Sequence, residues 1–295
     1  MSDLVILMLT YLMKKMVICI FLVVWMSIVA SATEPAPPKR IISLAPSTTE
    51  ILFALGLDDN IVGVTTFCDY PPAAKKKPKI GGMSNPSLES IVALNPDIVV
   101  MTTDGNPKEF EELLQGLHIN TIVFTARRIA ELPQGIRDLG SALHIQNRAD
   151  ALAKDIEQSL AKYGSGVKDR GIYSIKKLLY IVWPEPLIVA GPGTAIDDAI
   201  SILGWSNIAS TASSAYPKYS LEEVIRQAPD IILIGKASGM DMVKVSRGIL
   251  ERIKSLPAVR EDNVCYLGDG LYRLGPRVVQ GIEELAVCLE QKSPR

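Results

Sequence analysis

The chain has 295 residues, of which 31 are Lys or Arg and 32 are Asp or Glu, so its net charge is −1. Hydrophobic residues make up 48% of it, and the mean hydropathy is +0.22. A near-neutral chain without a basic block is not a protein that holds nucleic acid through phosphates, and this apolar content excludes a disordered chain.

The first 32 residues carry most of the apolar excess. Lys14 and Lys15 precede an uncharged run, Met16–Ala30, and a small-x-small sequence ends at Ala32. This order predicts a signal peptide over 1–32 that is cleaved after Ala32. The alternative is an uncleaved membrane anchor, which the run disfavours because it is shorter than the ~20 residues that span a bilayer.

The start of translation has two candidates, Met1 and Met13, since Met13 directly precedes the basic pair. The Pro-rich stretch 33–38 predicts a linker between the signal peptide and the folded chain.

The first elements of the folded chain follow one another closely. Arg40–Leu44 predicts a short buried strand, and Ser47–Glu50 has the spacing of a capping box that opens a helix ending at Gly56. Ile61–Val64 predicts a second strand, and Asp69–Pro72 predicts a turn.

The chain then repeats itself at a distance of 133 residues. Residues 87–100 and 220–233 both predict a short helix, a Pro-Asp break and an apolar strand. Two further pairs of segments occur in the same order in both halves, namely 50–56 with 198–204 and 120–124 with 263–267. We therefore expect an α/β fold of two Rossmann-like lobes, each with a parallel sheet between helices, over 39–130 and 173–295.

A helical segment over 131–172 is expected to connect the lobes. Within 146–170, apolar residues recur at helical spacing, which predicts one long amphipathic helix bridging the two sheets. These residues are Leu152, Ile156, Leu160, Tyr163 and Val167.

In such a fold, a ligand binds at the loops beyond the carboxyl ends of the strands. Aromatic residues stand in corresponding loops of both halves, which favours a flat, partly apolar ligand. The candidate ligand-binding residues are Tyr70, Met83, Asp104, Trp183, Tyr216, Asp269, Gly270, Leu271, Tyr272 and Arg273.

No residues with the pattern of a catalytic or metal site are evident. His118 and His144 are the two histidines, which is too few for an imidazole metal cluster, and Cys68 has no His nearby to activate it. We therefore expect neither a catalytic residue nor a resident cofactor. An enzyme on a similar two-lobed scaffold is the alternative from another class.

The three cysteines beyond the signal peptide are Cys68, Cys265 and Cys288, and none forms a Cys-x-x-Cys motif. Neither a disulfide framework nor a zinc site is indicated. One pair can form in an oxidising compartment, and the sequence leaves open which two cysteines would form it.

Glu89 and Glu222 occupy the same place in the repeated unit, in the first turn of each short helix. A carboxylate is favoured there by the helix dipole, which is one interpretation. The other is that the two carboxylates dock onto a symmetric partner with two basic pockets. The residues alone give both equal weight.

Several of these motifs together resemble one family of proteins. They are Arg40–Glu50, Cys68–Pro71, Ser87–Glu89, Gly191–Thr194, Ser220–Glu222 and Gly275–Arg277. The motifs resemble those of the periplasmic substrate-binding proteins with a helical backbone, known as class III, over about residues 39–290.

The resemblance implies a periplasmic receptor that captures cobalamin or a related corrinoid and delivers it to the permease of an ABC importer with its ATPase. Glu89 and Glu222 match the docking glutamates of the family, which favours the second interpretation above. Tyr70, Trp183 and the loop Asp269–Arg273 match positions that contact the ligand.

The resemblance also implies a monomer whose membrane contact is made only through the permease, with the corrinoid as transported ligand and not as cofactor. Ferric siderophores and haem are alternative ligands within the family. Leu203 stands where relatives have one half of a disulfide, so Cys288 is expected to have no partner.

Overall fold

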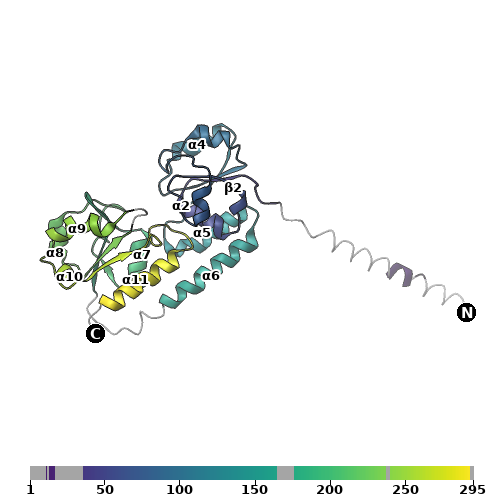
Figure 1. Ribbon diagram of the computed structural model, residues 1–295. Helices are drawn as coiled ribbons and strands as arrows, with labels where there is room; N and C mark the ends of the chain where they lie inside the picture. Colours follow the sequence, from purple (N-terminus) through teal and green to yellow (C-terminus); the bar gives the residue numbers. More distant parts are fainter. Residues whose placement is uncertain (1–10, 12, 17–35, 165–175, 237–239, 293–295) are drawn as a thin grey trace, which may run out of the picture. The chain divides into compact units, whose positions relative to one another are not determined.

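The computed structural model describes residues 11, 13–16, 36–164, 176–236 and 240–292. It divides into two units, Met1–Pro37 and Pro38–Arg295, and the second contains the fold discussed below (Figure 1). Most of the expected signal peptide, including its cleavage site, lies outside the described residues. Among the helices that are described, none is long and apolar enough to span a membrane.

The N-terminal lobe is built on a four-stranded parallel sheet in the order β2-β1-β3-β4. Its strands are β1 (Ile41–Ser43), β2 (Ile61–Val64), β3 (Ile98–Thr102) and β4 (Asn120–Phe124). Its helices are α2 (Pro46–Ala54), α3 (Leu88–Ala93) and α4 (Lys108–Gly116).

The C-terminal lobe has a sheet in the order β6-β5-β8-β9, with β7 also paired to β5. Its strands are β5 (Lys177–Pro184), β6 (Leu187–Val189), β7 (Ser206–Asn207), β8 (Ile231–Gly235) and β9 (Val264–Leu267). Its helices are α7 (Ala195–Ile202), α8 (Leu221–Gln227), α9 (Met242–Arg252), α10 (Pro257–Arg260) and α11 (Val278–Lys292).

The expected two α/β lobes are confirmed, with one difference in the second sheet. Strand β6 pairs with β5 in the antiparallel sense, so this sheet is mixed and not purely parallel. The cause is a tight return of the chain at Glu185-Pro186, where only two residues separate the strands. Such a short connection joins antiparallel strands, because a parallel pair needs a crossover of a dozen or more residues.

Each sheet has its own apolar core on one face. In the N-terminal lobe, Ile42, Val99 and Met101 pack with Ile91 of α3 and Leu114 of α4. In the C-terminal lobe, the corresponding core joins β5 and β8 to α8 and α9. The opposite faces of both sheets meet in a single third core, so both sheets have helices on both faces, as the repeat predicted.

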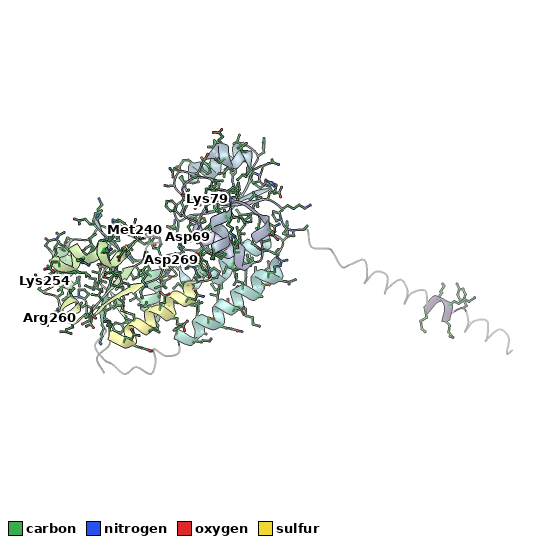
Figure 2. The ribbon with its side chains drawn as sticks, in the orientation of Figure 1. Asp69, Lys79, Met240, Lys254, Arg260 and Asp269 are labelled. Carbon is green, nitrogen blue, oxygen red and sulfur yellow. A yellow bond between two sulfur atoms is a disulfide. The ribbon has the colours of Figure 1, made fainter. Side chains whose placement is uncertain are left out.

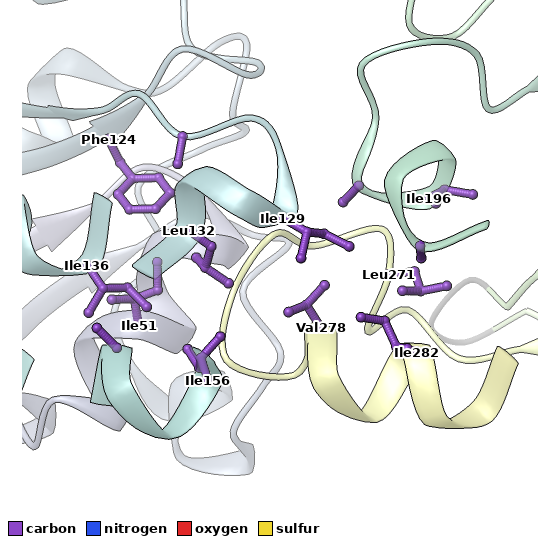
Figure 3. Close-up of a cluster of buried hydrophobic side chains, with 14 of the residues drawn as sticks. Ile51, Phe124, Ile129, Leu132, Ile136, Ile156, Ile196, Leu271, Val278 and Ile282 are labelled. Atoms are coloured by element: carbon purple, nitrogen blue, oxygen red, sulfur yellow. The ribbon is translucent and has the colours of Figure 1, made fainter. Parts of the chain in front are cut away.

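That third core joins the two lobes. Figure 3 shows Ile51 and Leu132 in the same cluster as Ile129, Ile196 and Val278. These side chains come from α2, α5, α7 and α11 and from the short 3-10 turn before α5. Because apolar burial is the main favourable contribution to folding, the shared core makes the two lobes interdependent.

The connecting segment contains two helices where the sequence predicted one. Helix α6 (Gln146–Gly164) is the expected long amphipathic helix, whose Ile156 is buried in the shared core, and α11 lies beside it (Figure 1). The additional helix is α5 (Leu132–Ala142). A Cβ atom on Gly140 of α5 would come within 2.1 Å of Ala149, so glycine permits the close packing of α5 against α6. Val167 lies outside the described residues.

The repeated units are the same in detail. Ser87 and Ser220 cap α3 and α8, each accepting a hydrogen bond from the backbone N–H three residues later. The following Pro-Asp sequences also act alike: Asp97 accepts from the N–H groups of Lys39 and Arg40, and Asp230 from that of Lys177. In both lobes, this carboxylate joins the entry of one strand to the entry of its neighbour.

The predicted start of the first helix was wrong by two residues. Helix α2 begins at Pro46, its N-cap is Ala45, and no side chain caps it. Proline is favoured in the first turn of a helix because it has no N–H to leave unpaired. The capping-box pattern beginning at Ser47 therefore lies inside the helix, where Thr48 and Thr49 donate to the carbonyl oxygen of Ala45.

The expectation for Cys288 was also wrong, because Cys265 and Cys288 form a disulfide. It joins β9 to α11 across 23 positions of sequence. The disulfide holds the last helix against the sheet of the C-terminal lobe. Cys68 is free and buried, and burial raises the pKa of its thiol.

We predict that removing this disulfide destabilises the protein by about 3 kcal/mol, since it closes a loop of moderate length in the unfolded chain. The comparison is the denaturant midpoint of the wild-type protein with that of Cys265→Ser/Cys288→Ser. Added reductant should lower the wild-type midpoint and leave that of the double variant unchanged. Equal midpoints for both oxidised proteins would contradict the prediction.

Candidate functional site

Two loops from different lobes meet through ion pairs. Asp69 and Tyr70 lie in the loop after β2, and Asp269, Arg273 and Arg277 lie between β9 and α11. Both loops follow the carboxyl ends of strands, where α/β proteins bind their ligands. Asp69 and Asp269 are labelled on the two loops in Figure 2, and Arg273 pairs with both of them.

The centre of this contact is Glu50 of α2, whose side chain is only 2% exposed. Arg277 donates to it through two nitrogens, Nε to Oε2 at 2.8 Å and Nη2 to Oε1 at 2.6 Å. A two-bond arginine–carboxylate pair of this kind is strong and fixes both planes. Arg277 also donates from Nη1 to Asp269 at 2.6 Å.

We name Glu50, Asp69, Asp269, Arg273 and Arg277 the interlobe ion cluster. It contains three carboxylates and two guanidinium groups, so its formal charge is −1. The neighbouring carboxylates hold the pKa of Arg277 well above its ordinary value, chiefly through its hydrogen bonds to Glu50. Both arginines are therefore charged and are already engaged by carboxylates of the protein.

A second buried ion pair occupies the place in the internal repeat that is equivalent to the pair of Glu50 and Arg277. Asp198 of α7 aligns with Glu50 of α2 in the repeated segments 198–204 and 50–56, and it is also buried. Its carboxylate accepts from Arg128 Nε at 3.0 Å and from the N–H of Ile129 at 2.9 Å. Arg128 belongs to the N-terminal lobe, so each lobe buries a carboxylate that an arginine of the other lobe neutralises.

Three tyrosines lie at or near the cluster. The ring of Tyr70 lies 4.1 Å from the Arg277 guanidinium carbon, a cation–π contact. The rings of Tyr216 and Tyr272 have their centroids 5.9 Å apart and are tilted by 57°. Tyr70 and Tyr272 are 41% and 51% exposed, so their rings offer apolar surface to a ligand.

The phenols of Tyr216 and Tyr272 are stabilised in their neutral form. Burial raises the pKa of both hydroxyls above the ordinary value of 10.0, and the nearby carboxylate of Asp104 raises it further. Asp104 is therefore close enough to both tyrosines to influence the pKa values of their hydroxyls.

Met83 and Asp104 lie in loops that Asn106 holds together. The Asn106 side chain donates to the carbonyl oxygens of Met83 and Leu44, and it accepts from the N–H of Thr102. The methyl end of Met83 packs where a side chain on Gly105 would collide with it, at 2.8 Å. The sequence placed Asn106 among the candidate loop residues, at a position after a buried strand where an Asn is a common organiser of loops.

Two of the predicted ligand contacts are buried. Leu271 is 1% exposed and belongs to the shared core, because its side chain packs against Gly281 at the start of α11. Gly270 is buried as well, and a side chain there would meet the backbone of Arg277 and Gly281. Neither residue presents a side chain to a ligand.

Trp183 and the two histidines have local roles. The indole N–H of Trp183 donates to the carbonyl oxygen of Glu185 at 2.8 Å, and the ring packs on the core formed with α8 and α9. His118 and His144 are exposed, each in a left-handed conformation just after α4 and α5. Within the described residues, no group of His, Cys, Asp or Glu side chains is arranged to hold a metal ion.

Glu89 and Glu222 are exposed in the first turns of α3 and α8. In the part of the chain that the structure describes, neither carboxylate makes an ion pair or a side-chain hydrogen bond. Glu223, next to Glu222, differs because it binds Arg226 and Gln227, and these contacts lower its pKa. One free carboxylate per lobe is thus presented at equivalent places.

The chain that forms this site matches a known protein family. The family model described as "Periplasmic binding protein" matches residues 41–271, which include the N-terminal lobe and the C-terminal lobe as far as the loop after β9. Of the interlobe ion cluster, this range contains Glu50, Asp69 and Asp269. The chain belongs to the periplasmic binding protein family. Members of this family are solute receptors.

Individual periplasmic binding proteins resemble this one over most of its length. An uncharacterized ABC transporter substrate-binding lipoprotein of Bacillus subtilis is 30% identical, over 84% of this chain and 79% of its own. The vitamin B12-binding protein BtuF of Vibrio cholerae has a similar structure, with a TM-score of 0.77 and 26% identity, covering 88% of this chain and 100% of its own.

A haem-binding relative is equally similar in structure. The periplasmic haem-binding protein RhuT of Roseiflexus sp. RS-1 has a TM-score of 0.78 and 29% identity, covering 86% of this chain and 98% of its own. Similarity of fold does not separate these two kinds of ligand, so the choice between them depends on the side chains of the site.

We predict that Glu50→Ala destabilises the protein by about 3 kcal/mol, because it leaves the partly buried Arg277 without its main counter-ion. The matched control is Glu112→Ala, which removes an exposed carboxylate of the same lobe from a surface pair and should cost less than about 1 kcal/mol. Denaturant unfolding of the three proteins measures both effects. Equal losses for the two variants would argue against a structural role for the ion cluster.

Proposed function

We propose that this periplasmic binding protein captures cobalamin or a related corrinoid at the three tyrosines and delivers it to the permease of an ABC importer. The observation that carries the proposal is the combination of exposed tyrosine rings with an ion cluster that has more carboxylates than arginines. Similarity to the vitamin B12-binding protein of Vibrio cholerae supports the choice.

Aromatic surface suits a flat macrocycle. Tyr70 and Tyr272 come from opposite lobes and are both about half exposed, so a planar ligand can contact both rings. Removing apolar surface from water contributes roughly 25 cal/mol per Å², which makes a large ring system a good source of affinity. Tyr216 lies against Tyr272 and supports its orientation.

Charge favours a neutral or cationic ligand over an anionic one. Arg273 and Arg277 are engaged by Glu50, Asp69 and Asp269, so no guanidinium of the cluster remains to bind a ligand carboxylate. Asp104 adds another negative charge near Tyr216 and Tyr272. A corrinoid carries neutral amide side chains, whereas haem carries two propionates that these carboxylates would repel.

Haem is the second candidate ligand, and the likeness to the Roseiflexus haem-binding protein is what favours it. Ferric haem is bound through a tyrosinate or an imidazole. The raised pKa values of Tyr216 and Tyr272 oppose tyrosinate formation, and both histidines are exposed at helix ends of the N-terminal half. Ferric siderophores that carry negative charge are disfavoured for the same reason as the propionates.

Delivery requires export and docking. The basic pair and apolar run of residues 1–32 support export by a cleavable signal peptide, and the family supports a periplasmic location. Glu89 and Glu222 are proposed to pair with cations of the permease, which works with its ATPase, while the receptor itself stays monomeric. We assign no catalytic residue and no resident cofactor.

We predict that the mature protein binds cyanocobalamin in isothermal titration and binds haemin and an anionic ferric catecholate siderophore at least tenfold more weakly. Tyr70→Ala/Tyr272→Ala should weaken cyanocobalamin binding by about ten- to a hundredfold, since each ring contributes about 1 kcal/mol or more. The control Tyr70→Phe/Tyr272→Phe keeps both rings and should retain the affinity. Tight binding of haemin with none of cyanocobalamin would replace the proposed ligand.

We predict that Glu89→Gln/Glu222→Gln abolishes uptake of cyanocobalamin without changing the affinity for it, because the variant loses only two exposed charges. Uptake by cells and titration of the purified protein measure the two properties separately. The control Glu109→Gln/Glu261→Gln removes the same charge from other exposed positions of the two lobes. Normal uptake by the first variant would refute docking through these glutamates.

A further inference from the structure

The two short helices that carry Glu89 and Glu222 match in exposure residue by residue. Ile91 and Val224 are buried, and the positions on either side of them agree in both units. The second exposed position is occupied by a branched aliphatic residue in each case. Val92 is 49% exposed and Ile225 is 47% exposed, and they are separated by the 133 residues of the repeat.

The aliphatic residue and the glutamate lie on the same side of each helix. Val92 follows Glu89 by three residues, as Ile225 follows Glu222. Residues three apart on a helix are neighbours, with Cβ atoms about 5 to 6 Å apart. Each lobe therefore presents a carboxylate and an uncovered aliphatic side chain as one small patch, which we name the paired patches.

A single exposed aliphatic residue needs no explanation, because much of any protein surface is apolar. Here, the same exposure recurs at the same place of the two lobes, each time beside a carboxylate without a partner in the described chain. The neighbouring positions are not alike in this way: Ala93 corresponds to Arg226, and Ser90 to Glu223. Among the exposed positions of the two helices, the repetition thus applies to the glutamate and the aliphatic residue together.

We propose that each paired patch is a two-part anchor for a twofold-symmetric membrane permease that presents, twice, a guanidinium or ammonium group beside an apolar hollow. This inference rests on the proposed function and adds the apolar half of the docking contact. Charge complementarity selects the cation, and the duplication of the patch at one internal offset selects a symmetric partner. Covering Val92 and Ile225 would exclude water from the adjacent ion pairs and strengthen them.

The test uses the mature protein loaded with cyanocobalamin and the corrinoid-importing permease of the same organism, reconstituted with its ATPase in lipid nanodiscs. Val92→Ser/Ile225→Ser should weaken the complex at least tenfold and leave cyanocobalamin affinity unchanged. Its binding should keep the salt dependence of the wild type, because both glutamates remain. The control is Leu113→Ser/Val245→Ser, which alters exposed aliphatic residues of α4 and α9 in the same lobes.

Two outcomes would overturn the inference. If Val92→Ser/Ile225→Ser binds the permease like the wild type while Glu89→Gln/Glu222→Gln does not, docking is purely ionic and the proposed function stands without the apolar half. If the Ser variant changes the oligomeric state of the receptor in sedimentation, the patches join copies of this chain instead. Full binding by the Gln variant would refute the proposed docking itself.

Discussion

The structure depends on the burial of a carboxylate in each lobe that only the other lobe can neutralise. Glu50 is held by Arg277 and Asp198 by Arg128, and the apolar core around both pairs contains residues of both lobes. A carboxylate left in such a core without a cation is strongly unfavourable. Separation of the lobes would thus expose apolar surface and leave two buried charges unpaired at once, which restricts relative motion to small adjustments.

This constraint also shapes the ligand site. Because the arginines nearest the tyrosines are needed to hold the lobes together, they are not available as ligand-binding cations. The site therefore combines rigid, fully paired charges with exposed neutral rings. The groups suited to meeting a partner protein lie elsewhere, on α3 and α8, where their contacts leave the ion cluster undisturbed. Capture of the solute and docking are thus assigned to separate surfaces of one rigid body.

The sequence predicted what depends on local pattern and on repetition. The strands of the N-terminal lobe, the repeated short helices and the Pro-Asp breaks were evident, since each is a signal of a few residues. Strands β5, β6 and β7 were not predicted. Partners far apart in sequence were not: Glu50 and Arg277 are separated by 227 positions, and nothing near either residue identifies the other. The Cys265–Cys288 pair was missed because three cysteines without a motif allow more than one pairing and the family resemblance pointed to the position of Leu203. The burial of Leu271 was not predicted, because burial is decided by distant neighbours.

The buried thiol of Cys68 makes this protein convenient for spectroscopy. Its side chain lies between Thr49 and Thr65, is 1% exposed, and is held protonated by the raised pKa that burial causes, so thiol reagents reach it poorly. The other cysteines that the structure describes are joined to each other. A new cysteine placed on the surface of each lobe can therefore carry a selective label while the native cysteines stay in place, and a pair of labels would report the distance between the lobes during transport.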